Sequence, residues 1–130
     1  MYIIGIDIGT TNCKIALFET KSFKLVKLYR FATGKIEKNG ETDFDLDQIW
    51  LNLKTGIREV CNDIEQKDKI IGISIASVGE SGVLINSDNM RIGPAIAWFD
   101  PRGSEYIQEI YKKKASNKIY EIVGVPPHSN

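Results

Sequence analysis

The first 19 residues of the chain contain two short apolar strands joined by a polar turn. Four isoleucines between residues 3 and 8 supply β-branched bulk on both faces of the first strand, and residues 15 to 18 resume the apolar pattern. The sequence from residue 7 to residue 14 is Asp-Ile-Gly-Thr-Thr-Asn-Cys-Lys. An unpaired carboxylate is costly to bury in such a strand, so the aspartate is informative. We expect the fold to be built around this hairpin.

The turn has the chemistry of a phosphate-binding loop. Gly9 lets the backbone approach an anion closely, and successive turn N–H groups can form a nest for it. The hydroxyl groups of Thr10 and Thr11 can donate to phosphate oxygens, and Lys14 adds positive charge. Asp7 can hold Mg²⁺ through the water shell that this ion retains. The alternative is a hairpin whose polar turn only faces water, although strand patterning rarely explains this combination of residues.

Two further segments predict strands of a mixed sheet. Residues 23 to 31 alternate apolar and basic side chains and predict a third strand, antiparallel to the second. Residues 69 to 76 predict a buried strand, and a helix followed by a strand implies a crossover, so this strand should run parallel to the first. Residues 33 to 42 are expected to form a polar loop without site chemistry.

Apolar residues at three- and four-residue spacing predict a helix from Asp45 to Gln66. Asp43 or Asp45 is the expected N-cap. Trp50 falls on the apolar stripe and is expected in the core, whereas Gly56 interrupts the stripe and indicates a close approach to the sheet.

The second half of the chain predicts a loop, a hairpin and two helices. Residues 77 to 82 follow the predicted parallel strand at its carboxyl end, where ligands of α/β sheets gather. Residues 83–85 and 92–98 are expected to pair as a hairpin. A helix is expected from Ser104 to Lys114 and a short one from Lys118 to Val123. The side chains expected to face inward from the first of these helices are Tyr106, Ile107, Ile110 and Tyr111.

Composition narrows the class of protein. With 130 residues and 42% hydrophobic residues the chain fits one domain with a real core. Seventeen basic residues balance 17 acidic ones, which argues against a nucleic acid as the main partner. No apolar run approaches membrane-spanning length and no signal-type segment opens the chain, so we expect no membrane partner and a cytoplasmic location.

Two motifs resemble a known family. The sequence of residues 7 to 14 resembles the first phosphate motif of the actin, Hsp70 and sugar-kinase superfamily. The order of strands and helix is similar to the α/β ribonuclease-H-like half-domain of that superfamily. Gly-Glu-Ser-Gly-Val at residues 79–83, followed by Gly-Pro-Ala-Ile-Ala-Trp-Phe-Asp-Pro-Arg at residues 93–102, resembles the substrate side of the FGGY carbohydrate kinases. These enzymes phosphorylate polyols, ketoses and sugar acids.

The resemblance implies roles for ten residues. It implies that ATP and Mg²⁺ are bound on the side of Asp7, Gly9, Thr10, Thr11 and Lys14, with Asp7 toward the metal ion. It implies that a small-molecule sugar or polyol is bound by Glu80, Ser81, Trp98, Asp100 and Arg102. Carboxylates accept hydrogen bonds from sugar hydroxyls, and a Trp face packs on C–H groups.

Details of the second motif bear on the substrate. Glu80 matches the position that carries Glu in glycerol kinases and His in xylulokinases. Gly79 departs from the glycerol-kinase pattern, which has Arg there, so glycerol is a doubtful substrate. Phe99 and Pro101 are closer to the pentulose and gluconate kinase branches.

Structural roles remain open for the same residues. Glu80 can cap a turn, and Trp98 can be a core residue. Asp100 and Arg102 can form an ion pair that holds the structure rather than contacts a substrate.

Family members are several times longer than this chain, and the resemblance places their general base in a later segment. We therefore expect residues 1–130 to be a truncated, N-terminal part of the first kinase domain, inactive alone because phosphoryl transfer needs both substrates positioned. Open sheet edges favour association, so a homodimer is expected. Two alternatives are a small ribonuclease-H-like nuclease using Asp7 and Glu80, and a non-catalytic sugar-sensing regulator. The neutral charge and the turn with its Lys argue against the nuclease.

Overall fold

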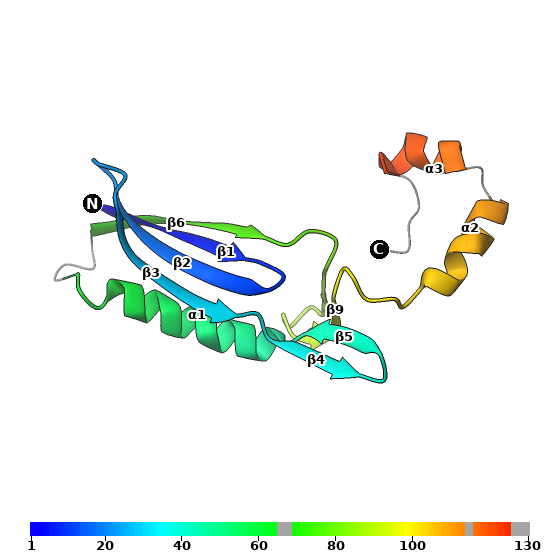
Figure 1. Ribbon diagram of the computed structural model, residues 1–130, viewed down its shortest axis with the longest axis horizontal. Coiled ribbons are helices and arrows are strands. Elements are labelled where there is room, and N and C mark those ends of the chain that lie inside the picture. The colour runs from blue at the N-terminus through cyan, green and yellow to red at the C-terminus, as the bar shows by residue number, and fades with distance from the viewer. Residues whose placement is uncertain (65–68, 114–115, 126–130) are drawn as a thin grey trace.

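The computed structural model describes residues 1–64, 69–113 and 116–125. Its main element is a four-stranded sheet in the order β3-β2-β1-β6 (Figure 1). The strands are β1 (Tyr2–Ile8), β2 (Asn12–Glu19), β3 (Leu25–Ala32) and β6 (Ile70–Ser77). The first three are antiparallel neighbours, and β6 runs parallel to β1. The α/β mixed sheet predicted from the sequence is confirmed.

Helix α1 (Leu46–Cys61) covers one face of this sheet (Figure 1). Asp45 is its N-cap, as predicted, because the carboxylate accepts a hydrogen bond of 3.0 Å from the Gln48 amide. The helix ends at Cys61, earlier than predicted, and the expected end at Gln66 lies outside the described residues. The core forms between α1 and the sheet. Its buried members include Ile4, Ile6, Cys13, Ile15, Leu17, Ile49, Leu53 and Val60.

Trp50 lies outside the core, so its predicted burial is wrong. Its side chain is 62% exposed, and the Lys54 ammonium lies 5.6 Å from the centre of its ring. The cause is the position of the helix over the sheet. Helix α1 contacts β2 and β3, and its buried side carries Ile49, Leu53, Gly56 and Val60, a row to which Trp50 does not belong.

Strand β6 pairs as predicted, but its predicted burial is also wrong. Ile73 is aligned with Ile4 and Ile75 with Ile6 in the parallel register, which places each pair on one face of the sheet. Both β1 side chains are buried, whereas Ile73 and Ile75 are more than half exposed. Helix α1 packs on this same face but over β2 and β3, and no described element covers β6 there.

Gly56 lies where α1 approaches the sheet closely, as the sequence predicts. A Cβ atom at this position would clash with the Ile15 Cδ1 atom and lie 2.5 Å from the Tyr29 Cδ1 atom. The buried glycine therefore sets the distance between the helix and strands β2 and β3.

Replacing Gly56 by alanine is expected to lower the free energy of unfolding by about 1–2 kcal/mol. Alanine favours a helix by about 1 kcal/mol over glycine, but overpacking a close contact costs about 1–3 kcal/mol. Urea denaturation followed by circular dichroism measures the change. Glu59→Ala, at an exposed position of the same helix, is the control and should stay within about 0.5 kcal/mol. Equal stability of the two variants would contradict the close approach.

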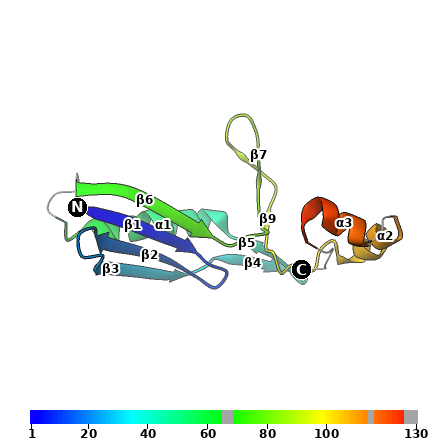
Figure 2. The ribbon, with the colours of Figure 1, turned by 90° about the horizontal axis from the view of Figure 1, so that it is seen from above.

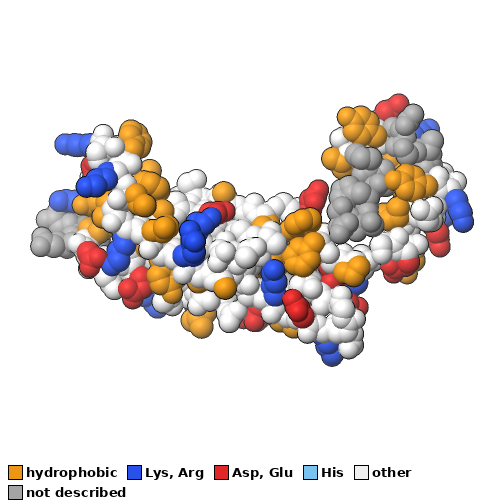
Figure 3. All heavy atoms as spheres, viewed as in Figure 1, with side chains coloured by type: hydrophobic (Ala, Val, Ile, Leu, Met, Phe, Trp, Pro, Cys, Tyr) orange, Lys and Arg blue, Asp and Glu red, His pale blue; other side chains and the backbone are white. Residues whose placement is uncertain are grey.

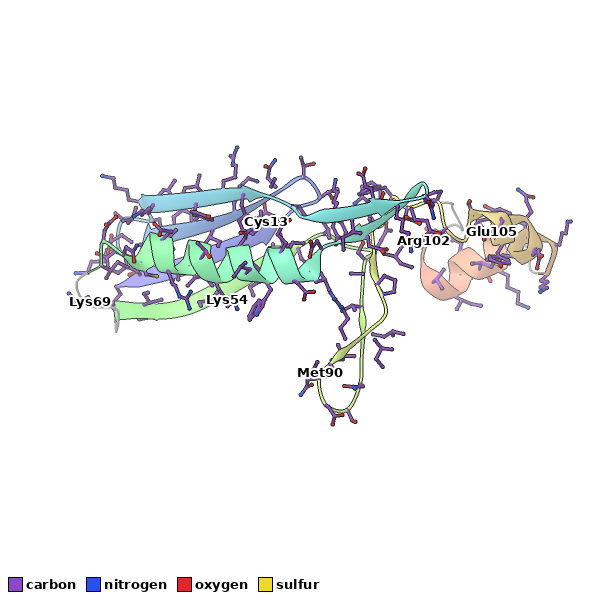
Figure 4. The ribbon with its side chains drawn as sticks, turned by 90° about the horizontal axis from the view of Figure 1, so that it is seen from below. Cys13, Lys54, Lys69, Met90, Arg102 and Glu105 are labelled. Atoms are coloured by element: carbon purple, nitrogen blue, oxygen red, sulfur yellow. The ribbon has the colours of Figure 1, made fainter. Side chains whose placement is uncertain are left out.

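A second, three-stranded sheet extends from the first. It contains β4 (Lys35–Lys38), β5 (Glu41–Phe44) and β9 (Ala95–Ile96) in that order. The loop predicted for residues 33–42 is therefore wrong, because most of it is a hairpin. The hairpin predicted for residues 83–85 and 92–98 is partly wrong as well: β7 (Leu84–Ile85) pairs with β8 (Arg91–Ile92), whereas β9 pairs with β5. The β7–β8 hairpin projects away from the sheet, with Met90 near its tip (Figures 2 and 4).

The C-terminal helices lie apart from both sheets (Figure 1). A 3₁₀ helix (Ser104–Tyr106) leads into α2 (Ile107–Lys113), and α3 (Ser116–Val123) follows. None of the side chains predicted to face inward is buried; Tyr106, for example, is 58% exposed. Figure 3 shows hydrophobic side chains gathered on the surface of this part of the molecule. The prediction failed because the apolar stripe of α2 has no described layer to pack against.

No helix within the described ranges is long and apolar enough to span a membrane.

Candidate functional site

The turn between β1 and β2 is closed by its own backbone. The Gly9 amide donates a hydrogen bond of 3.2 Å to the Asn12 carbonyl. A Cβ atom on Gly9 would lie 2.6 Å from that same carbonyl oxygen. Gly9 is therefore required by the tight turn itself, and its N–H group is used inside the turn rather than offered to an anion.

Asp7 and Lys14 face each other across this hairpin. They are directly paired in the β1–β2 register, and the Lys14 Nζ atom donates to the Asp7 Oδ2 atom over 3.0 Å. The side chains remain 50% and 41% exposed, so both are accessible to a ligand. A carboxylate suits the water shell of Mg²⁺ and an ammonium suits a phosphate, so the pair fits the predicted ATP and Mg²⁺ side.

Thr33 holds the turn from the end of β3. Its hydroxyl donates to the Gly9 carbonyl over 2.7 Å, and its amide donates to the Thr11 carbonyl over 3.0 Å. Because the single hydroxyl proton is used in that bond, the Cys13 thiol is the donor in its 3.4 Å contact with the Thr33 oxygen. Thr33 is buried, and sequence reasoning missed it. The available signal was strand pairing, which brings the end of the third strand beside the turn.

The two sequence motifs meet at Trp98. Its indole Nε1–H group donates a hydrogen bond of 3.0 Å to the Thr10 hydroxyl, 88 residues away in the chain. The Trp98 ring also meets the Phe99 ring edge to face, with 5.5 Å between centres. Phe99 in turn packs edge to face on Phe44 at 6.3 Å. An aromatic row from β5 thus supports the Trp side chain next to the turn between β1 and β2.

A cavity of about 740 Å³ opens beside this tryptophan. Four of the five predicted substrate residues line it: Glu80, Trp98, Asp100 and Arg102. Apolar residues of the β7–β8 and β9 segments supply most of the remaining wall, including Val83, Leu84, Ile92, Pro94 and Ile96. The volume is in the range of small-molecule sites.

Glu80 and Ser81 take different positions in the loop after β6. Glu80 is exposed at the cavity and has a φ angle of 59°, a left-handed conformation that costs energy for a residue with a side chain. Ser81 lines a second, smaller cavity of about 200 Å³ together with Gly9. Its Oγ atom is buried there without a hydrogen-bond partner among the described residues.

Asp100 and Arg102 form a buried cross-link. The Asp100 side chain is 0% exposed and accepts hydrogen bonds from the Thr42 amide, the Arg102 amide at 2.9 Å and the Arg102 Nε atom at 2.6 Å. Arg102 also donates to the Asp43 carboxylate and, over 3.1 Å, to the Thr42 carbonyl. Both Asp100 oxygens therefore accept protein donors, which gives Asp100 a positioning role. Figure 4 shows Arg102 where the chain leaves the second sheet for the C-terminal helices.

Comparison with known proteins decides the family. The model of the N-terminal domain of the FGGY family of carbohydrate kinases matches residues 2–130. This chain belongs to the FGGY family of carbohydrate kinases. A rhamnulokinase from Halalkalibacterium halodurans is 26% identical over 125 residues, which cover 95% of the chain and 26% of that protein.

Solved structures of a xylulose kinase, a gluconate kinase and a glycerol kinase share the fold. A xylulose kinase from Lactobacillus acidophilus has a TM-score of 0.80 at 27% identity and covers 92% of the chain, and the chain covers 24% of it. A gluconate kinase from Lactobacillus acidophilus has a TM-score of 0.81 at 27% identity; the match covers 92% of the chain and 24% of that protein. The glycerol kinase of Plasmodium falciparum has a TM-score of 0.82, and the match covers 98% of the chain and 26% of that protein. Because the identity is only 21%, this likeness supports the fold alone. The chain thus spans about a quarter of the length of these relatives, and none of the three is a nuclease or a regulator.

In this FGGY domain, the ion pair strongly perturbs the Asp100 carboxyl. The hydrogen bond from Arg102 lowers the pKa of Asp100 to about 2, against the opposing effect of burial. At the far end of β2, the Ser22 hydroxyl and the amides of Lys21 and Ser22 lower the pKa of Glu19 to about 2. Both groups are thus more acidic in the folded chain than in the unfolded one.

Stability of the FGGY domain is expected to fall at acid pH. A carboxyl group whose pKa is lowered by folding gives its full stabilisation at a pH above its pKa in the unfolded chain, which is 3.8 for Asp100 and 4.5 for Glu19. This stabilisation is lost as the pH falls toward the folded pKa of about 2. Urea midpoints measured between pH 5 and pH 2 should therefore decrease. Glu19→Gln should retain the part of the decrease that comes from Asp100. A midpoint that does not change over this range would contradict the ionised cross-link.

Proposed function

We propose that this chain supplies the phosphate turn and a wall of the sugar pocket of an ATP-dependent carbohydrate kinase. The reaction transfers the γ-phosphate of ATP to a hydroxyl group of a sugar or polyol. The hydrogen bond between Trp98 and Thr10 carries the proposal, because it brings the nucleotide motif and the substrate motif to one place. Family membership supports the same reaction class.

In this proposal Gly9 closes the turn, and the other predicted residues bind the ligands or position residues that do. Lys14 and the hydroxyls of Thr10 and Thr11 hold phosphate oxygens, and Asp7 orients the water shell of Mg²⁺. Bound ATP supplies the phosphoryl group. Glu80 accepts hydrogen bonds from sugar hydroxyls at the cavity, the Arg102 guanidinium donates to them, and the Trp98 ring face packs on sugar C–H groups. Asp100 acts through Arg102, which it positions. Ser81 lines the smaller cavity beside Gly9 and offers its hydroxyl group to the ligand from there.

The substrate we propose is a ketose or a sugar acid rather than glycerol. The chain has Gly79 where the glycerol-kinase pattern has Arg. The cavity of about 740 Å³ also has room for a five- or six-carbon sugar. The relatives with 27% identity are a xylulose kinase and a gluconate kinase.

No described residue is assigned the role of general base. Phosphoryl transfer needs two positioned substrates and charge stabilisation, and the chain spans only a quarter of its relatives. We therefore propose that residues 1–130 bind but do not turn over their ligands. A coupled ADP-release assay with D-xylulose, D-gluconate, L-rhamnulose and glycerol tests this. Robust turnover by the chain alone would refute the need for further kinase parts.

Calorimetric titration with MgATP tests the phosphate turn directly. Lys14→Met should weaken binding about tenfold, because it removes a charge-assisted hydrogen bond. Lys27→Met is the matched control: Lys27 also pairs with an aspartate, Asp63, at 2.6 Å, but it lies on the edge strand β3 away from the turn. Equal affinity of the two variants, or a folded chain that binds no MgATP, would contradict the proposal.

Two further parts of the proposal concern the setting of the protein. We propose a cytoplasmic location, where ATP and sugars are available. We also propose a homodimer, because β6 is an edge strand of the described sheet with exposed isoleucines, and such edges favour association. Light scattering after gel filtration measures the oligomeric state, and a monomer at high concentration would exclude the dimer.

A further inference from the structure

The hydrogen bond between Trp98 and Thr10 fixes the direction in which Thr10 can donate. The indole Nε1–H group is a donor without acceptor capacity, whereas a hydroxyl has one proton and two lone pairs. Because the Thr10 oxygen accepts from Trp98 over 3.0 Å, its own proton is left for another acceptor. Thr10 lies in the turn between β1 and β2, next to the Asp7–Lys14 pair, where β1 ends and β2 begins.

The same bond fixes the position of the Trp98 ring. Trp98 is 40% exposed and lines the large cavity. Phe99 supports the ring from one side through an edge-to-face contact at 5.5 Å, and Thr10 holds its nitrogen. A Trp side chain that lost the tether would keep the Phe99 contact but gain freedom to turn into or out of the cavity. Thr10 therefore helps to set the shape of the cavity wall that Trp98 forms.

We propose that Thr10 couples the phosphate site to the sugar pocket through Trp98. A phosphate oxygen that accepts the Thr10 proton polarises the hydroxyl and makes its oxygen a better acceptor for the indole N–H group. Phosphate binding then strengthens the tether and orders the Trp98 wall. Linkage makes the effect reciprocal: a sugar packed on the ordered ring favours phosphate binding by the same factor. This inference rests on the proposed function, since it needs an anion at the turn.

Nuclear magnetic resonance of the ¹⁵N-labelled chain can test the coupling. The chain has two tryptophans, and Trp50→Phe removes the indole signal of the exposed Trp50, so the remaining signal belongs to Trp98. The probes are inorganic phosphate and MgATP. The amides of residues 9–14 report whether the anion binds, and the Trp98 indole proton reports whether the pocket wall responds.

Three variants separate the coupling from simple binding. Thr10→Val removes the hydroxyl, Thr10→Ser retains it, and Thr11→Val removes the neighbouring hydroxyl, for which the structure gives no bond to Trp98. In the parent chain and in Thr10→Ser, the indole signal should shift on titration. In Thr10→Val, the Trp98 indole proton should exchange faster with solvent, and its signal should not shift on titration. The affinity of this variant for MgATP should be about fivefold lower. In Thr11→Val the indole signal should still shift at saturation.

The outcomes distinguish this inference from the proposed function. Amide shifts in the turn with an unchanged indole signal in the parent chain would leave phosphate binding in place and refute the coupling. An indole shift in Thr10→Val as large as in the parent chain would refute Thr10 as the link. A folded chain whose turn amides do not respond to either probe would refute both. A dispersed amide spectrum for each variant shows that it is folded.

Discussion

Replacing Asp100 by asparagine is expected to lower the free energy of unfolding by about 3 kcal/mol at pH 7. The Asp100 carboxylate is fully buried and accepts N–H groups from Thr42 and Arg102. The asparagine amide group presents a donor where these donors converge, so at least one N–H group loses its acceptor. The Arg102 guanidinium also loses a charged partner. Chemical denaturation followed by circular dichroism measures the loss.

The matched control is Asp47→Asn. Asp47 also pairs with an arginine, Arg91, at 3.0 Å, but its side chain is 86% exposed. Exposed ion pairs contribute about 0–1 kcal/mol, so this variant should differ little from the parent chain. The contrast between the two substitutions isolates burial as the cause. If Asp100→Asn costs no more than Asp47→Asn, the cross-link does not hold the second sheet.

The sequence predicted the main sheet because its strands carry their own signals. Apolar runs and alternation mark β1, β2, β3 and β6, and a short polar turn between two strands sets an antiparallel register. That register places Asp7 opposite Lys14, and the crossover rule gives β6 its parallel direction. Each of these features is local or follows from chain order, so no knowledge of tertiary packing is needed.

One group of failed predictions concerns what covers an apolar face. Trp50, Ile73 and Ile75 are apolar at regular spacing, but they are exposed because no described layer lies over them. The same is true of Tyr106 near α2. Periodicity shows which side chains share a face, whereas burial depends on a partner element elsewhere in the fold. Such errors therefore concern packing rather than secondary structure.

The β4–β5 hairpin was missed although its signal is in the sequence. Asn39 and Gly40 form its turn with φ angles of 53° and 83°, and an Asn-Gly pair between strands is the strongest short-range sign of a hairpin. The consequence reaches the site, because Thr42 and Asp43 of β5 hold Asp100 and Arg102. The motif residues could be predicted from the sequence, but the strand that positions them was not.

Replacing Gly9 by alanine is expected to disrupt the phosphate turn. The new Cβ atom would lie 2.6 Å from the Asn12 carbonyl oxygen, which also accepts the Gly9 amide. The Asn12 oxygen belongs to the backbone and the Cβ position is fixed by the backbone, so the clash cannot be relieved by a side-chain rotation. The turn must open, and the Thr33 bond to the Gly9 carbonyl must shift with it. We expect a loss of about 2 kcal/mol in stability and at least about tenfold weaker MgATP binding, from the lost geometry of charge-assisted contacts.

Gly72→Ala is the control, since a Cβ atom on Gly72 in β6 meets no atom within 4 Å. This substitution should stay within about 0.5 kcal/mol, as surface changes do, and leave MgATP binding unchanged. Denaturation and calorimetric titration of both variants give the comparison. Equal stability would show that the turn tolerates a side chain. A destabilised Gly9→Ala chain that binds MgATP normally would instead show that the anion does not depend on the closed turn, and the site would then have to rest on Lys14 and Asp7 alone.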